Sequence, residues 1–205
     1  MDNIKYLTRY EFEEILKAIK SSDSPYKIRD LTMIMLAEYC ALRISEAIAM
    51  KKEYYVPKTH EIFCPRLKDS NSNNLKILDE DLIELLEYHI ATSDPKQEYL
   101  FISQIGKPIS REQALIIFKS YCRKAGIIEE KKINFHSLEH TRGQFLADSG
   151  FDIKEVQYWL GHKSIKNTYI YFQFSQTQKM AMYKKLEGFY NNKQGLLNDM
   201  VFEEK

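Results

Sequence analysis

The sequence has few of the features that mark secreted, disulfide-linked or membrane-spanning proteins. Its three cysteines, Cys40, Cys64 and Cys122, are far apart, odd in number and without C-x-x-C spacing. Neither a disulfide framework nor a thiolate zinc site is therefore indicated. A run of about 18 apolar residues that would span a bilayer is absent, and the N-terminus lacks the basic-then-apolar pattern of a signal peptide. We therefore expect a protein of the reducing cytoplasm, with no membrane partner.

An excess of charge of one sign is also missing. Lys and Arg together number 30 and Asp and Glu 29, which gives a net charge of +1. Any DNA-binding surface must then come from an asymmetric placement of charges. Internal repeats and low-complexity tracts are absent, and 205 residues with 44% hydrophobic content suffice for one sizeable core. We expect one domain over residues 1–190 and a polar C-terminal tail over 191–205.

The spacing of apolar residues predicts a mainly α protein with a small antiparallel β-sheet. Thr8 with Glu11 and Asp152 with Glu155 form capping boxes, which mark helix starts. Further amphipathic or apolar runs predict helices near residues 28–38, 43–50, 79–91, 110–121 and 176–190, and another from residue 136. Two short β-rich pieces, 61–65 and 75–78, are separated by turn-forming residues and predict a hairpin.

The segment HSLEHTRGQF, followed by LGHKSIKNTYIY, contains His136, His162 and Tyr171 at separations of 26 and 9 residues, and Arg43 lies far upstream in ALRISE. Cleaving a DNA strand without metal requires an oxygen nucleophile, cations that hold the phosphate oxygens, and an acid for the leaving oxygen. These residue types can fill such roles. The pattern resembles the tyrosine recombinases, the phage-integrase family, from about Leu7 to Leu186, and implies their catalytic-domain fold.

The resemblance implies a role for each residue. Tyr171 would attack the phosphate to form a 3′-phosphotyrosine and release a 5′ hydroxyl, Arg43 would clamp phosphate oxygens, and His136 and His162 would bond to the phosphate and help to move protons. Tyr169 is the competing tyrosine. With about 3.6 residues per helical turn it would project about 160° away from Tyr171, so only one of the two can enter the pocket.

Two further positions follow from the same resemblance. Lys68 lies at the start of the predicted β-turn, where the family keeps a lysine that protonates the leaving oxygen, and Lys76 is the alternative across the turn. Ala41 stands where the family commonly has glycine.

Glu139 departs from the family pattern, because H-x-x-R supplies a second phosphate-clamping arginine at this position. Losing one such donor costs on the order of 100- to 1000-fold in rate, and reversing its charge should cost more. Arg142, three residues on, would either reach the phosphate in compensation or pair with Glu139, which we favour slightly. Glu139 is either a natural feature of a degenerate or regulatory member or a substitution.

Two other functions stay open. A DNA-binding accessory or regulator would keep the recombinase scaffold without cleaving DNA, and Glu139 favours it. The letters HSLEH also fit the H-x-x-E-H signature of zinc peptidases, in which His136 and His140 would bind zinc beside a catalytic Glu. A third ligand would then have to come from elsewhere.

The resemblance further implies site-specific DNA recombination or integration without metal or cofactor, as in phages and mobile elements. The chain is similar to small single-domain invertases that switch fimbrial genes, and we expect no arm-binding or core-binding domain. The implied partners are double-stranded DNA, a homotetramer on paired sites, and DNA-bending accessory proteins. The amphipathic run from Met180 to Leu186 would either dock into a neighbouring protomer or pack on its own domain.

Overall fold

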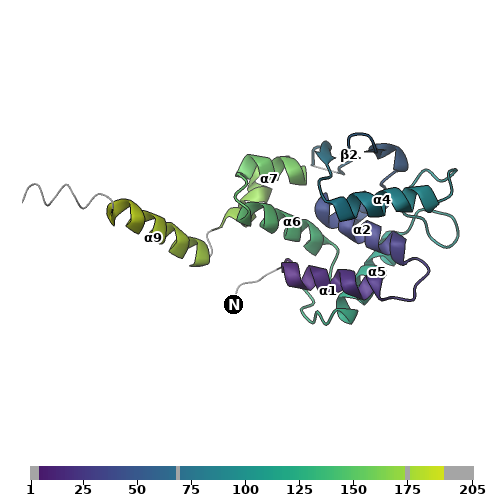
Figure 1. Cartoon of the computed structure of the whole chain (residues 1–205), viewed down its shortest axis with the longest axis horizontal. Coiled ribbons are helices and arrows are strands. Elements are labelled where there is room, and N and C mark those ends of the chain that lie inside the picture. Colours follow the sequence, from purple (N-terminus) through teal and green to yellow (C-terminus); the bar gives the residue numbers. More distant parts are fainter. Residues whose placement is uncertain (1–4, 68–69, 174–175, 192–205) are drawn as a thin grey trace, which may run out of the picture. The chain divides into compact units, whose positions relative to one another are not determined.

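The computed structural model describes residues 5–67, 70–173 and 176–191 (Figure 1). The sheet is made of β1 (Tyr55–Val56), β2 (Glu61–Cys64) and β3 (Asn73–Lys76), and short 3₁₀ turns occur at η1 (Lys52–Tyr54) and η2 (Tyr169–Phe172). The described helices are α1 (Arg9–Lys20), α2 (Lys27–Tyr39), α3 (Ile44–Ile48), α4 (Glu80–Thr92), α5 (Arg111–Lys124), α6 (His136–Asp148), α7 (Ile153–Leu160), α8 (Ile165–Thr168) and α9 (Gln176–Asn191). This arrangement confirms the predicted mainly α class with one small antiparallel sheet.

The chain divides into two compact units, Met1–Tyr171 and Phe172–Lys205. In the second unit the described element is α9, which matches the helix predicted at residues 176–190. Within the described ranges, no helix is both long enough and apolar enough to cross a membrane.

Helix α2 forms the centre of the first unit. Its sequence is apolar on most sides, and Met33, Ile34 and Leu36 are fully buried. A helix of this kind has to be covered on all sides, and α1, α3, α4 and α6 pack against it (Figure 1). Because α2 is fixed from several directions, the segment that leaves its C-terminal end is held firmly in place.

That segment turns sharply at Ala41, whose φ of +52° lies in the left-handed region. An L-amino acid in this conformation costs about 1–2 kcal/mol, whereas glycine adopts it freely. This cost is a physical reason for the glycine that the sequence pattern commonly has where this chain has Ala41. The buried Arg66 guanidinium donates to the carbonyl oxygens of Ala41 and Cys40, at 2.8 and 2.7 Å, and so stabilises the turn. The turn brings Arg43 to the N-cap of α3.

The three strands run antiparallel in the order β1-β2-β3. In the hairpin, Cys64 faces Asn73 and Glu61 faces Lys76, which confirms the predicted pairing. Strand β3 begins at Asn73, two residues earlier than expected. Asparagine is common in turns, so the sequence did not place Asn73 in the strand. The Asn73 side chain donates to the Tyr158 and Trp159 carbonyl oxygens of α7, and this tertiary contact extends the strand.

The predicted capping box of Asp152 and Glu155 opens α7, and Gly161 ends it with φ +68°. A Cβ atom on Gly161 would lie 2.7 Å from the Asn71 carbonyl oxygen. The Asn71 amide in turn donates to the Gly161 carbonyl oxygen at 2.7 Å, and Ser70 forms a β-bridge with His162. The connection between β2 and β3 is thereby attached to the segment that carries His162.

Candidate active site

The carboxylate of Glu139 lies at the centre of a cluster of cationic and imidazole groups. Its Oε2 is 2.8 Å from His136 Nδ1 and 3.4 Å from Arg43 Nε, and its Oε1 is 3.0 Å from His162 Nε2. These residues come from three segments: the N-cap of α3, the first turn of α6, and the residue after Gly161. The fold therefore brings together Arg43, His136 and His162, although Arg43 and His162 lie more than 100 residues apart in the sequence.

Glu139 is almost fully buried, with 2% of its surface exposed. Burial on its own would raise the pKa of this carboxyl, but the neighbouring His136, His162 and Arg43 hold the pKa well below its usual range. The group is an anion at neutral pH. Oε2 nevertheless lacks an aligned hydrogen bond among the described residues, although two basic groups lie within contact distance. Glu139 thus makes charge contacts where its neighbours could instead hold another anion.

Both ring nitrogens of His162 are engaged. Nε2 contacts Glu139, which as an ionised carboxylate can only accept, so Nε2 carries a proton. Nδ1 lies 3.0 Å from the Thr168 hydroxyl, and both side chains are buried. The Glu139 carboxylate therefore occupies the Nε2 donor of His162.

Tyr171 lies in η2 and is buried, with 4% exposure, whereas Tyr169 is 61% exposed. Burial raises the pKa of Tyr171, and the Glu139 carboxylate raises it further. The Tyr171 hydroxyl is 3.0 Å from His140 Nδ1. The sequence argument that only one of the two tyrosines turns inward agrees with these exposures, although the local turn is 3₁₀ and not α-helical.

Gly143 provides the space for the Tyr171 ring. A Cβ atom at this position of α6 would lie 2.6 Å from Tyr171 Cζ, closer than any side chain tolerates. The ring of Tyr171 consequently packs directly on the backbone of α6, and its hydroxyl reaches His140 one turn earlier on the same helix.

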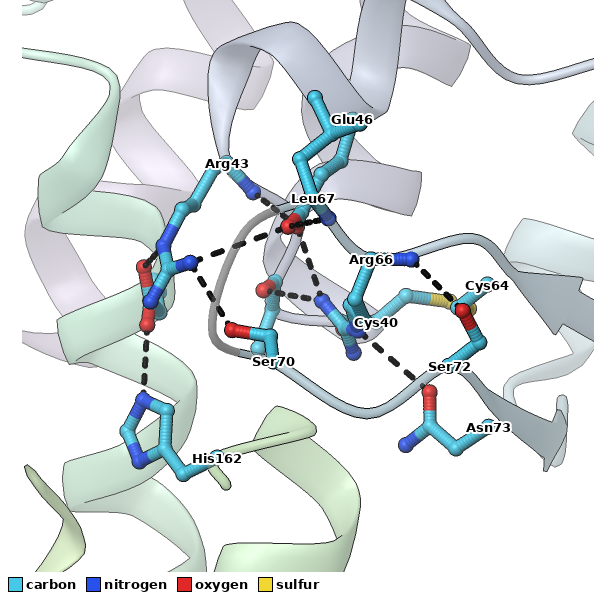
Figure 2. A network of polar contacts seen from close by, with 12 residues as sticks. Cys40, Arg43, Glu46, Cys64, Arg66, Leu67, Ser70, Ser72, Asn73 and His162 are labelled. Carbon is cyan, nitrogen blue, oxygen red and sulfur yellow. Dashed lines mark hydrogen bonds and ion pairs between the residues drawn. The ribbon is translucent and has the colours of Figure 1, made fainter. Parts of the chain in front are cut away.

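A second polar network holds Arg43 in position (Figure 2). The backbone amide of Arg43 donates to Glu46 Oε2 at 3.0 Å, and its Nη1 donates to the Ser70 hydroxyl at 3.0 Å. Arg66 approaches Glu46 from the other side, with 3.2 Å between Nη1 and Oε2, and both side chains are 1% exposed. The Glu46 and Arg66 pair thus fixes the residues on each side of the turn that presents Arg43.

A cavity of about 750 Å³ opens beside this cluster. Among its lining residues are Arg43, His136, Arg111 and Asn134. The rest of the lining is largely apolar, so Arg43, Arg111 and His136 place basic groups at the edge of an apolar hollow.

Two of the residues predicted from the sequence are lysines of the hairpin. Lys68 lies outside the described residues; its described neighbours Leu67 and Ser70 contact Glu46 and Arg43. Lys76 is an exposed residue of β3.

The favoured pairing of Arg142 with Glu139 is wrong. Arg142 Nη2 pairs with Glu38 Oε2 of α2 at 2.7 Å, and its guanidinium lies 4.6 Å from the centre of the Tyr39 ring. The two residues share a side of α6, but the buried carboxylate of Glu38 and an aromatic face offer Arg142 a partner on the neighbouring helix.

The arrangement of the described side chains does not support the hypothesis of a zinc peptidase. The rings of His136 and His140 do share a face of α6, with centroids 4.4 Å apart. In the part of the chain that the structure describes, however, no group of three or more His, Cys, Asp or Glu residues is placed to hold a metal ion.

The sequence did not predict the contact between His140 and Tyr171. It also did not predict that Gly143 makes room for the Tyr171 ring or that Arg66 pairs with Glu46. The one available signal was Gly143, because a glycine in the interior of a predicted helix often marks close packing. The other two depend on contacts between distant segments.

Comparison with known proteins identifies the family of this chain. The chain matches the Phage integrase family over residues 5–178. It is 32% identical to the type 1 fimbriae regulatory protein FimB of Escherichia coli K12, over 83% of this chain and 86% of FimB. It is 28% identical to the tyrosine recombinase XerC of Roseiflexus castenholzii, over 80% of this chain but only 54% of XerC.

Solved structures show the same fold. The XerA recombinase aligns with a TM-score of 0.72 and 23% identity, over 88% of this chain and 62% of XerA. A XerH recombinase bound to palindromic difH substrate, in a post-cleavage complex, aligns with a TM-score of 0.75 and 22% identity, over 89% of this chain and 53% of XerH. The fold is that of a tyrosine recombinase catalytic domain. The chain belongs to the phage integrase family.

Proposed function

We propose that this protein breaks and rejoins duplex DNA at specific sites through Tyr171, and that Glu139 slows the reaction. The observation that carries the proposal is the convergence of Arg43, His136 and His162 on one point, within 3.4 Å of a single carboxylate. In the proposed cycle these groups hold the scissile phosphate, and Tyr171 forms a 3′-phosphotyrosine. Lys68 is the proposed acid for the leaving 5′ oxygen.

Glu139 occupies the place proposed for the phosphate. A phosphodiester also carries one negative charge, so it must displace the carboxylate or share the pocket with it. At a separation of about 4 Å and an effective dielectric constant of about 20, two like charges repel by about 4 kcal/mol. Solvent screens about half of this repulsion, and the remaining penalty of roughly 2 kcal/mol corresponds to an approximately 30-fold slower reaction. The proposed reaction is therefore slow and not absent.

The proposed assembly follows from strand exchange. Two duplexes have four strands to cut, so one nucleophile per protomer requires a homotetramer on paired sites. DNA-bending accessory proteins would help to bring such sites together. In this proposal residues 1–190 form the catalytic domain and 191–205 a tail.

Covalent capture tests the proposal. Tagged protein is incubated with duplexes of randomised sequence that carry a nick near the centre, so that cleavage releases a short strand and traps the adduct. We expect DNA that stays attached to the protein in detergent and is lost in Tyr171→Phe. Tyr169→Phe is the matched control, because it removes the neighbouring exposed hydroxyl, and it should keep the adduct. An adduct that persists in Tyr171→Phe contradicts the proposed nucleophile.

The second candidate is a DNA-binding regulator that does not cleave. This candidate is favoured by the buried Glu139 anion, which contacts Arg43, His136 and His162, the residues proposed to bind the phosphate. A regulator would shift the mobility of duplex DNA without leaving an adduct in either the wild type or Glu139→Arg.

A further inference from the structure

We propose that His140 is the general base of the cleavage step: it takes the proton from the Tyr171 hydroxyl as the oxygen attacks phosphorus, and returns it when the strand is rejoined. This inference rests on the proposed function, because it assigns a further catalytic residue to that reaction.

The geometry meets the first requirement of a general base, which is hydrogen-bonding reach of the proton that it removes. His140 Nδ1 lies 3.0 Å from the Tyr171 hydroxyl oxygen, and the two ring centroids are 5.8 Å apart. Gly143 lets the Tyr171 ring approach α6 closely enough for this contact. With the Nε2-protonated tautomer, the Nδ1 lone pair accepts the phenol proton.

The surroundings of His140 keep it neutral. Burial is the largest cause that lowers the pKa of His140, the imidazole of His136 is the next, and the net pKa is about 4. The nearby Glu139 carboxylate opposes this shift, while Lys5 and His162 add to the lowering. At neutral pH the ring therefore has a lone pair available, whereas a protonated ring could not accept.

The other basic groups of the cluster contact partners other than the Tyr171 hydroxyl. The oxygens of Glu139 contact His136, His162 and Arg43. His162 uses Nε2 for Glu139 and Nδ1 for Thr168. Among the residues that the structure describes, His140 is the one whose hydrogen bond reaches the Tyr171 hydroxyl.

The step balances without an oxidant or a cofactor. The Tyr171 O–H bond breaks and its proton moves to His140 Nδ1, while the phenol oxygen bonds to phosphorus. The bond from phosphorus to the 5′ oxygen breaks, and that oxygen takes a proton from the acid proposed at Lys68. Because burial raises the pKa of Tyr171, free phenolate is scarce, and removal of the proton has to accompany bond formation.

His140→Asn is the direct test. The Asn side-chain oxygen still accepts a hydrogen bond from Tyr171 but is not basic, so Tyr171 should keep its position while the base is lost. We expect the single-turnover rate of adduct formation to fall by roughly 100- to 10,000-fold, the usual contribution of general acid–base catalysis. Thermal melting of the variant shows whether it is folded.

His60→Asn is the matched control. His60 Nδ1 makes the same kind of bond to a tyrosine, at 2.9 Å from the Tyr55 hydroxyl, on the sheet. Its φ of +55° is one that Asn tolerates. The control should cleave at the wild-type rate.

A fluorinated tyrosine at position 171 separates base catalysis from positioning. The phenol of fluorotyrosine has a lower pKa and needs a base less, so placing it in His140→Asn should restore much of the lost rate. This doubly altered protein should also cleave faster as the pH rises. A purely structural defect would not be rescued. If His140→Asn cleaves as fast as the wild type, or if fluorotyrosine restores nothing, the base assignment is wrong and the proposed function stands. If neither the wild type nor Glu139→Arg forms an adduct, the proposed function fails, and the base assignment fails with it.

Discussion

Replacing Glu139 by Gln removes one charge from the centre of the cluster and changes little else. Gln has nearly the same shape, and its amide oxygen can still accept from His162 Nε2. In the wild type an incoming phosphodiester meets a carboxylate that lies 2.8 Å from His136 Nδ1 and 3.4 Å from Arg43 Nε. In Glu139→Gln those two groups are free to bind the phosphate without competition.

The size of the gain follows from the geometry. Two like charges about 4 Å apart repel by about 4 kcal/mol at an effective dielectric constant of about 20. Solvent reaches the site through Arg43, whose side chain is 36% exposed, and screens part of this repulsion. Taking about half, or roughly 2 kcal/mol, predicts an approximately 30-fold faster formation of the covalent adduct. Glu139→Arg also adds a phosphate donor, and should gain on the order of 100- to 1000-fold.

The assay is the single-turnover rate of adduct formation on the best captured duplex. Glu87→Gln is the control: it removes a carboxylate on α4 that accepts from the Tyr55 hydroxyl at 2.9 Å, and it should leave the rate unchanged. A Glu139→Gln protein that cleaves no faster than the wild type would refute the reasoning. It would mean that the carboxylate does not compete with phosphate.

Three further predictions concern the framework of the site. Gly143→Ala puts a methyl group where the Tyr171 ring lies, so it should abolish the adduct while circular dichroism shows unchanged helix content, and overpacking should lower the unfolding free energy by about 1–3 kcal/mol. Arg66→Met leaves the Glu46 carboxylate buried without its partner and should cost about 3–5 kcal/mol in denaturant unfolding, part of which Glu46→Gln in the same chain restores. Because the pKa of Glu139 is lower in the folded protein than its ordinary 4.5, its carboxylate stabilises the fold fully above about pH 4.5 and progressively less as the pH falls, so Glu139→Gln should show a shallower loss of melting temperature below that pH.

Local sequence patterns determined most of the secondary structure. Two capping boxes and the apolar runs mark helix positions within a few residues, since capping and amphipathic spacing depend on neighbours in the chain. The all-round apolar character of α2 indicated its place in the core. The motif spacing also selected Arg43, His136 and His162 as one group, although they lie far apart in the sequence.

Tertiary structure decided what those residues contact. The sequence could pair Arg142 with Glu139 because they are three positions apart, but a buried carboxylate on α2 is the stronger partner for a guanidinium. It could not show that Glu139 faces inward, that His140 reaches Tyr171, or that Gly143 makes room for the ring. These facts depend on where α2, α6 and η2 meet, and contacts between distant segments are fixed by packing of the whole core, while periodicity describes only one element at a time.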